Sequence, residues 1–104
     1  MKNLKEDKKA RSKSFFLNSE KEFFNEKLIN FLEKFFKKNK TDVRICLHKG
    51  RKDKHHDMII LQQKKNFYSP HKHLKKGETY HMIKGSMACV LFSDKGKIKK
   101  ISKI

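Results

Sequence analysis

The stretch "PHKHLKKGETYHMIKG", residues 70–85, sets two histidines one residue apart and follows them with a glutamate and a glycine. Alternate side chains of a strand point to the same face, so in a strand His71 and His73 share a face. Leu74 to Gly77 would form the connection, and Glu78 would begin the returning strand close to His73. The spacing therefore predicts that two imidazoles and one carboxylate converge on a single point.

Two histidines and a carboxylate form a ligand set for a divalent transition metal. Fe, Mn, Zn, Ni and Co all suit such a set, and it leaves coordination positions open for water or substrate. Tyr80 and Met82 have the same strand phase as Glu78, which makes Tyr80 a candidate hydrogen-bond donor or general acid, with packing as the alternative. By the same reasoning Gln62 and Tyr68 are candidates to line a cavity.

Around this stretch the apolar residues alternate with period two. The pattern predicts short strands at residues 43–48, 57–63, 66–73, 78–83, 86–92 and 97–104, separated by brief turn-like links. The last three links each contain a glycine suited to a positive φ angle. Residues 41–104 are therefore predicted to be a mainly β domain, a sandwich or barrel built from hairpins.

Residues 19–40 show helical periodicity instead. An apolar stripe recurs at helical spacing, and Ser19 with Glu22 has the spacing of a capping box. We interpret the stripe as core or as a subunit contact rather than as a ligand groove. Residues 1–18 are rich in lysine and lack periodicity, which predicts a mobile basic lead.

Composition limits the function classes. The chain has 104 residues, enough for one modest core, and a formal net charge of +17 that comes mostly from lysine. Proteins that recognise nucleic acid usually do so with arginine side chains, so this excess of lysine is better explained by an AT-rich gene. The positive electrostatic field of the chain still attracts anions. No apolar run is long enough to span a membrane or to form a signal-peptide core, and we expect a soluble, cytoplasmic protein.

The spacing also carries a family resemblance. His71, His73, Glu78 and Gly85 match the first motif of the cupins, G(X)5HXH(X)3-4E(X)6G, with Lys65 in place of its first glycine. Residues 43–98 resemble the WbuC-type cupin-fold metalloproteins, which are typically encoded among genes for bacterial surface polysaccharide synthesis. The resemblance implies a small jelly-roll β-barrel, a metal held by the two histidines and the glutamate, and a sugar or nucleotide sugar as substrate.

The chain departs from the cupin pattern in lacking a second motif, which usually supplies a fourth ligand. Six strands make an incomplete barrel with an open edge. A partner subunit could complete it, the helix could cover it, or the chain could be a shortened descendant without activity; we favour a homodimer. His48, which ends a predicted strand, is the candidate for a fourth metal ligand.

The residues leave enzyme and non-enzyme functions open. In the enzyme hypothesis, a metal polarises a sugar substrate for isomerisation or epimerisation, and the lysines favour an anionic substrate. In the alternative, the chain is a non-catalytic module that binds a metal or a sugar. A basic nucleic-acid binder, with incidental histidines, ranks last.

Overall fold

The computed structural model describes residues 3–17, 25–64, 66, 68–72 and 77–104. The chain forms two compact units, Met1–Asn66 and Phe67–Ile104. The first unit contains a four-stranded sheet and a helix, and the second contains a two-stranded sheet. The described strands make two open sheets and no closed barrel, so the mainly β prediction is confirmed at this level.

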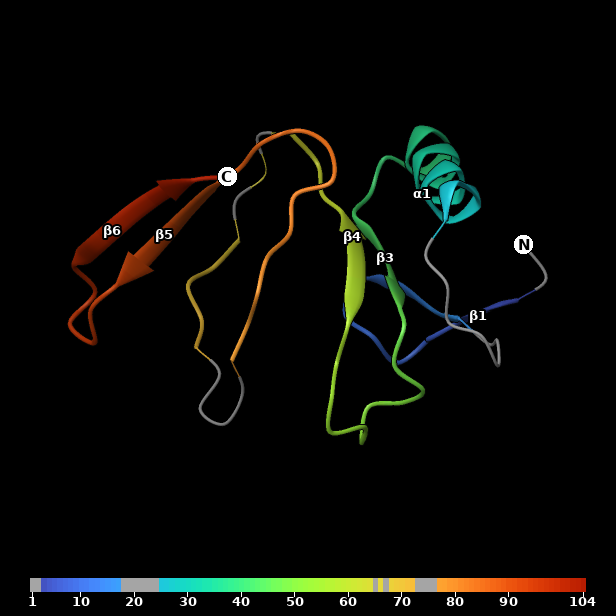
Figure 1. Cartoon of the computed structure of the whole chain (residues 1–104), viewed down its shortest axis with the longest axis horizontal. Helices are drawn as coiled ribbons and strands as arrows, with labels where there is room; N and C mark the ends of the chain where they lie inside the picture. The colour runs from blue at the N-terminus through green and yellow to red at the C-terminus, as the bar shows by residue number, and fades with distance from the viewer. Residues whose placement is uncertain (1–2, 18–24, 65, 67, 73–76) are drawn as a thin grey trace. The chain divides into compact units, whose positions relative to one another are not determined.

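The sheet of the first unit has the strand order β1-β2-β3-β4 (Figure 1). Its strands are β1 (Leu4–Glu6), β2 (Lys13–Leu17), β3 (Val43–Cys46) and β4 (Met58–Leu61). β2 and β3 are parallel, whereas the outer pairs β1–β2 and β3–β4 are antiparallel. Parallel neighbours require a crossover, and helix α1 (Glu26–Asn39) lies between β2 and β3 in the chain.

Helix α1 begins and ends with local capping interactions. The side-chain oxygen of Asn25 accepts hydrogen bonds from the backbone N–H groups of Lys27 and Leu28. At the other end Lys40 adopts a left-handed conformation, φ 52°, and its N–H donates to the carbonyl of Phe36. Within the described residues, no helix combines the length and apolar character needed to cross a bilayer.

The core of the first unit lies between α1 and one face of its sheet. Five buried apolar residues form it: Leu17, Leu28, Leu32, Val43 and Ile45. At its margin Phe15 of β2 packs edge-on against Phe31 and Phe35, with ring centroids 5.3 and 5.5 Å apart. The apolar stripe of the helix is thus core, as the sequence predicted.

Two predictions about the first 40 residues are wrong. Residues 1–18 are not free of structure, because they contribute β1 and β2. The alternation of apolar residues in β2 was hidden because a serine, Ser14, occupies one of its fully buried positions. The helix begins at Glu26 rather than Ser19, since Asn25 is extended with φ −145°. Ser19 and Glu22, the predicted capping box, lie outside the described residues.

The second unit contains the antiparallel pair β5 (Ala88–Phe92) and β6 (Ile98–Lys103). Their turn is closed by a hydrogen bond of 2.7 Å from the N–H of Ser93 to the carbonyl of Lys97, and Gly96 within it has φ +81°. Gly85 has φ +82°, a conformation that favours glycine. The prediction of positive φ angles is confirmed at Gly85 and Gly96 and is wrong at Gly77, whose φ is not positive.

The two central predicted strands are the main error in the β pattern. Described residues 68–72 and 77–82 belong to no strand, although strands were predicted at 66–73 and 78–83. Alternation there places polar side chains on both faces, as Lys72 beside His71 and Thr79 beside Glu78 illustrate. With little apolar area on either face, period two alone does not favour a paired strand.

The core makes a stability prediction. Ile45 is 0 % exposed in β3, and Ile60 of the adjacent β4 is 46 % exposed. Ile45→Ala is expected to lower the free energy of unfolding by about 2–5 kcal/mol, because truncation leaves a cavity. Ile60→Ala removes the same atoms from a half-exposed position and is expected to cost about 1 kcal/mol or less. Urea denaturation followed by circular dichroism measures both, and equal losses would contradict this account of the core.

Candidate functional site

The predicted ligands His71 and Glu78 lie in the second unit, and both are exposed. The Nδ1 atom of His71 is 3.2 Å from the carbonyl oxygen of Ser69. A carbonyl only accepts, so this hydrogen bond assigns a proton to Nδ1 of His71. His73, the second predicted histidine, lies outside the described residues.

Glu78 is joined to Tyr80. The Tyr80 hydroxyl donates a hydrogen bond of 2.7 Å to Oε2 of Glu78. The contact arises because residues two apart in extended backbone project to the same side, which is the relation used to single out Tyr80 in the sequence. The structure therefore brings together a predicted ligand and the predicted proton donor.

This hydrogen bond changes the acidity of the phenol. The bond to Glu78, partial burial and the charges of Glu78 and Cys89 raise the pKa of Tyr80 to about 12. The hydroxyl is consequently protonated at neutral pH. Tyr80 can donate a hydrogen bond or a proton at this site, but it cannot act there as a base.

His48 lies in the first unit, just after β3, and is only 8 % exposed. Its ring stacks on His56 with centroids 4.1 Å apart and meets the edge of Phe16 at 5.8 Å. Its Nδ1 accepts a 3.2 Å hydrogen bond from the backbone N–H of Asp57. Burial lowers the pKa of His48, so the ring is held neutral, the form in which a histidine binds metals.

The other predicted residues are more exposed. Gln62 lies in the first unit and is exposed; Tyr68 and Met82 lie in the second unit and are 48 % exposed and half-buried, respectively. Their role in lining a cavity stays a prediction. Across residues 3–17, 25–64, 66, 68–72 and 77–104, no three or more His, Cys, Asp or Glu side chains are grouped so as to hold a metal ion.

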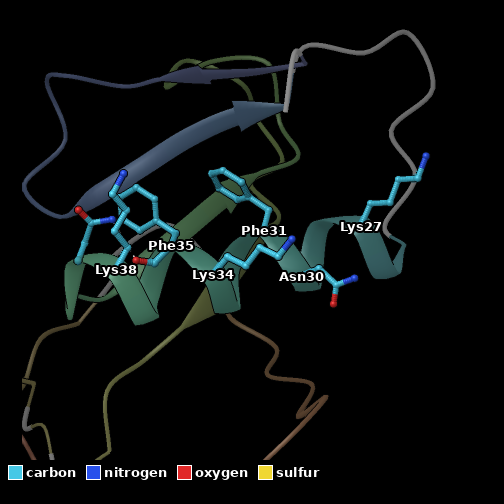
Figure 2. A pocket seen from close by; sticks show the side chains of 7 residues that line it. Lys27, Asn30, Phe31, Lys34, Phe35 and Lys38 are labelled. Atoms are coloured by element: carbon cyan, nitrogen blue, oxygen red, sulfur yellow. Dashed lines mark hydrogen bonds between the residues drawn. The ribbon is translucent and has the colours of Figure 1, made fainter.

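A groove on α1 was missed by the sequence analysis (Figure 2). It has a volume of about 640 Å³, and its lining consists of lysine, asparagine and phenylalanine: Lys27, Asn30, Phe31, Lys34, Phe35, Lys38 and Asn39. Phe31 and Phe35 line the groove and also pack against the margin of the core. The signal in the sequence was the recurrence of lysine at positions 27, 34 and 38, which helical spacing places in one row with Phe31.

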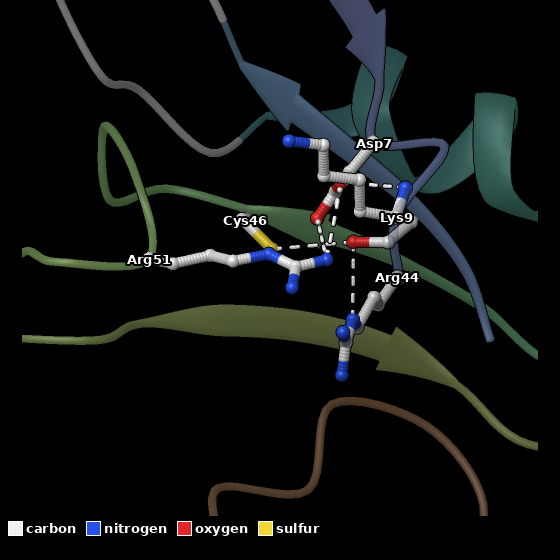
Figure 3. Close-up of polar contacts among 6 residues, drawn as sticks. Asp7, Lys9, Arg44, Cys46 and Arg51 are labelled. Carbon is white, nitrogen blue, oxygen red and sulfur yellow. Dashed lines mark hydrogen bonds and ion pairs between the residues drawn. The ribbon is translucent and has the colours of Figure 1, made fainter. Parts of the chain in front are cut away.

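A polar cluster on the sheet was also missed, because it joins residues far apart in the chain (Figure 3). One Nη atom of Arg51 contacts both carboxylate oxygens of Asp7, at 3.2 and 3.3 Å. Burial raises the pKa of Asp7, but the hydrogen bonds from Lys9 and Arg51 and the nearby arginine charges outweigh it and lower the pKa. Asp7 thus stays ionised and ties the segment after β1 to the loop between β3 and β4.

Beside this pair, Nε of Arg44 donates to the buried hydroxyl of Ser14 at 3.1 Å, and that hydroxyl lies 3.5 Å from Sγ of Cys46. Each of these polar groups has a partner within the sheet. The arrangement explains why a serine and an arginine are tolerated in the middle of β2 and β3.

A family model described as "Domain of unknown function (DUF6016)" matches residues 30–104. The matched range begins within α1 and includes every residue singled out above as a predicted ligand, donor or cavity-lining group. No curated protein and no solved structure matches the chain.

The contact between Tyr80 and Glu78 can be tested by titration. The chain has two tyrosines, so a Tyr68→Phe background leaves the phenolate absorbance of Tyr80 alone. The pKa of Tyr80 should be about 12 in that background and should fall towards 10.0 when Glu78→Ala removes the acceptor and its charge. Asp94→Ala, which removes another exposed carboxylate of the same unit, is the control and should leave the titration unchanged. An unchanged pKa in Glu78→Ala would show that the hydrogen bond does not form in solution.

Proposed function

We propose that this chain, which belongs to the family described as "Domain of unknown function (DUF6016)", binds a divalent transition metal and acts on a sugar or nucleotide sugar. The proposed ligands are His71, His73 and Glu78. The observation that carries the proposal is the motif they form with Gly85, together with the hydrogen bond that Tyr80 makes to one of the ligands.

The proposed architecture is a small jelly-roll barrel of the cupin type. Strands β3, β4, β5 and β6 fall within four of the six predicted strand segments, which supports it. The described residues 68–72 and 77–82, which carry His71 and Glu78, belong to no strand, so the proposed barrel requires these two segments to pair when a metal is bound. A metal shared by His71 and Glu78 would hold those two segments against each other.

The side chains available suit metal binding. His71 and Glu78 supply an imidazole and a carboxylate, the donor types that divalent transition metals accept in proteins. Mn, Fe, Zn, Ni and Co all accept this set, so the ligands do not choose among them. His48, the predicted fourth ligand, lies in the first unit, and its Nδ1 lone pair accepts the Asp57 N–H, so its role as a ligand stays a prediction.

When bound, such a metal polarises a carbonyl or hydroxyl oxygen of the substrate. Tyr80 is the proposed proton donor: its hydroxyl, protonated at neutral pH, would exchange its 2.7 Å hydrogen bond to Glu78 for one to a substrate oxygen that gains negative charge, while a separate base would take the proton from carbon. The proposed reaction class is isomerisation or epimerisation within bacterial surface polysaccharide biosynthesis, carried out in the cytoplasm.

The charge of the chain favours an anionic substrate. With a formal net charge of +17, the molecule raises the local concentration of phosphorylated ligands. Lys72, next to His71, is 67 % exposed and its ammonium lies 3.4 Å from the Asp94 carboxylate, a pairing that solvent makes weak. Lys72 is therefore available to a phosphate of the substrate.

Two other functions are supported by particular observations. Tyr80 is 56 % exposed, and such openness also suits a module that binds a metal or sugar without catalysis. The groove on α1, with lysines beside phenylalanine rings, is the feature that favours nucleic acid, whose binding would weaken steeply with salt.

Metal binding is tested by elemental analysis of the purified protein after dialysis against each candidate metal. The wild type should retain about one metal ion per chain. His71→Ala and Glu78→Gln should each weaken metal affinity at least about tenfold, because each removes a ligand. His81→Ala removes an exposed histidine outside the motif and serves as the matched control. If metal content is the same in all four proteins, the proposed site is wrong.

Catalysis is separated from simple binding by Tyr80→Phe. This change removes the proton donor and leaves the proposed ligands in place, so metal content should be unchanged. Exchange of carbon-bound hydrogen for solvent deuterium in phosphorylated sugars should slow about 10²–10⁴-fold, as expected for loss of a general acid. Tyr68→Phe is the control. Metal binding without exchange in the wild type would instead identify a non-catalytic module.

A further inference from the structure

The hairpin of β5 and β6 presents a face made almost entirely of apolar side chains. Val90 pairs with Ile101, and Phe92 pairs with Ile98, across the two strands. Residues two apart in a strand project to the same side, so these four side chains share one face, which we name the Val90 face. They are 37 % (Val90), 42 % (Phe92), 59 % (Ile98) and 58 % (Ile101) exposed.

A β-bulge creates this face. Ile98 and Ile101 are three residues apart, and an unbroken strand would point them to opposite sides. The register shifts between Leu91, which pairs with Lys100, and Phe92, which pairs with Ile98, so Lys99 is the extra residue. Bulges of this kind re-aim side chains. Here the bulge places both isoleucines beside Val90 and Phe92.

The opposite face of the hairpin is different. It carries Met87, Cys89 and Ser102, all half-buried, together with Lys100 and Leu91. The Cys89 side chain is close enough to Tyr80 to contribute to its raised pKa, so residues of the same unit approach this side. Leu91 on this side is nevertheless 59 % exposed, so the two faces differ at Met87, Cys89 and Ser102, which are half-buried, whereas all four apolar side chains of the Val90 face are exposed.

The second unit has an energetic reason to cover the Val90 face. It spans Phe67–Ile104, close to the size of about 40 residues below which a chain usually needs a metal, disulfides or oligomerisation to fold. A two-stranded hairpin alone is marginally stable at best in water. Burying these four side chains would add apolar area where the unit has little.

We propose that the Val90 face is a docking surface for the same face of a second copy of this chain. Charge favours this partner. Lys103, which pairs with Ala88 at one end, is the one charged side chain paired into this face, so the face offers little to an acidic protein or a polyanion. An uncharged apolar face is complementary to another such face, and a second copy provides it in two-fold symmetry.

The lysines oppose edge-to-edge joining of two hairpins through β6, although the other outer strand, β5, carries no charged residue. β6 is an outer strand, and it carries Lys99, Lys100 and Lys103. Lysine on an edge strand disfavours edge-to-edge pairing, because like charges would meet across the new ladder. Face-to-face packing keeps Lys100 on the outer side and, in an antiparallel arrangement, places the two Lys103 side chains at opposite ends.

The contact is small and the dimer is accordingly weak. Four large side chains bury less than the roughly 800 Å² per partner of a standard interface, which suits dissociation constants in the micromolar to millimolar range. Two chains of net charge +17 also repel each other. Added salt screens that repulsion and should strengthen the dimer, the reverse of its effect on polyanion binding.

Sedimentation equilibrium of the full chain, from about 1 µM to about 1 mM at low and high salt, tests the proposal. The wild type should form a concentration-dependent dimer that strengthens with salt. Ile101→Thr, which keeps a β-branched side chain but makes the face polar, should raise the dimer dissociation constant about tenfold or abolish the dimer. Circular dichroism checks that the variant is folded, and Val90→Thr gives a second, independent change on the same face.

Leu91→Thr is the matched control. Leu91 and Ile101 are 59 % and 58 % exposed and lie on opposite faces of the same hairpin, so only the face differs between the two variants. A wild type that stays monomeric over the whole range, or equal weakening by Leu91→Thr and Ile101→Thr, would overturn the proposal. Running the series with and without a chelator keeps it separate from the metal site, because the proposed contact uses none of the proposed ligands.

Discussion

The packing of one helix on one parallel strand pair governs the first unit. Leu28 and Leu32 of α1 are 1 % and 4 % exposed, and they close over Val43 and Ile45 of β3, at 1 % and 0 %. β2 can lie parallel to β3 only because the chain returns through α1. That return places β1 and its Asp7 at the same sheet, where Asp7 reaches Arg51 of a loop far along the chain. The polar cluster is a consequence of the helix packing.

The alternation of apolar residues located a strand correctly where its pairing partner is the next strand in the sequence. The period of two located β3 with β4 and β5 with β6, each an antiparallel neighbour in sequence. It failed for β2, whose partner β3 is reached only through the helix, and whose buried Ser14 reads as a surface residue until Arg44 and Cys46 are beside it. It also failed in residues 68–72 and 77–82, where alternation is present but neither face is apolar. Pairing depends on the energy of the faces as well as on the period.

In the candidate site too, contacts between residues close in sequence were predictable, and contacts made by loop closure were not. Spacing placed Tyr80 beside Glu78, because a relation of two residues is set by the backbone alone. His56 is half-buried against His48 through a loop closure that no local pattern encodes. His81 and His55 are exposed. Sequence spacing therefore predicted the contact between residues two apart, Tyr80 and Glu78, but not the contact between His48 and His56, which depends on the loop.

The two units differ in how much they bury, and this bears on function. Every fully buried side chain among the described residues belongs to the first unit. The described residues of the second unit, which carries His71, Glu78 and the Val90 face, therefore lack a closed core of their own. A ligand that binds only the folded form stabilises it in proportion to the logarithm of its concentration over its dissociation constant. A metal at the proposed ligands and a second copy on the Val90 face would each stabilise this unit, and through its fold each would raise the affinity for the other. On this view, binding and folding of the second unit are one equilibrium, so the proposed ligands would reach their binding geometry as the unit folds.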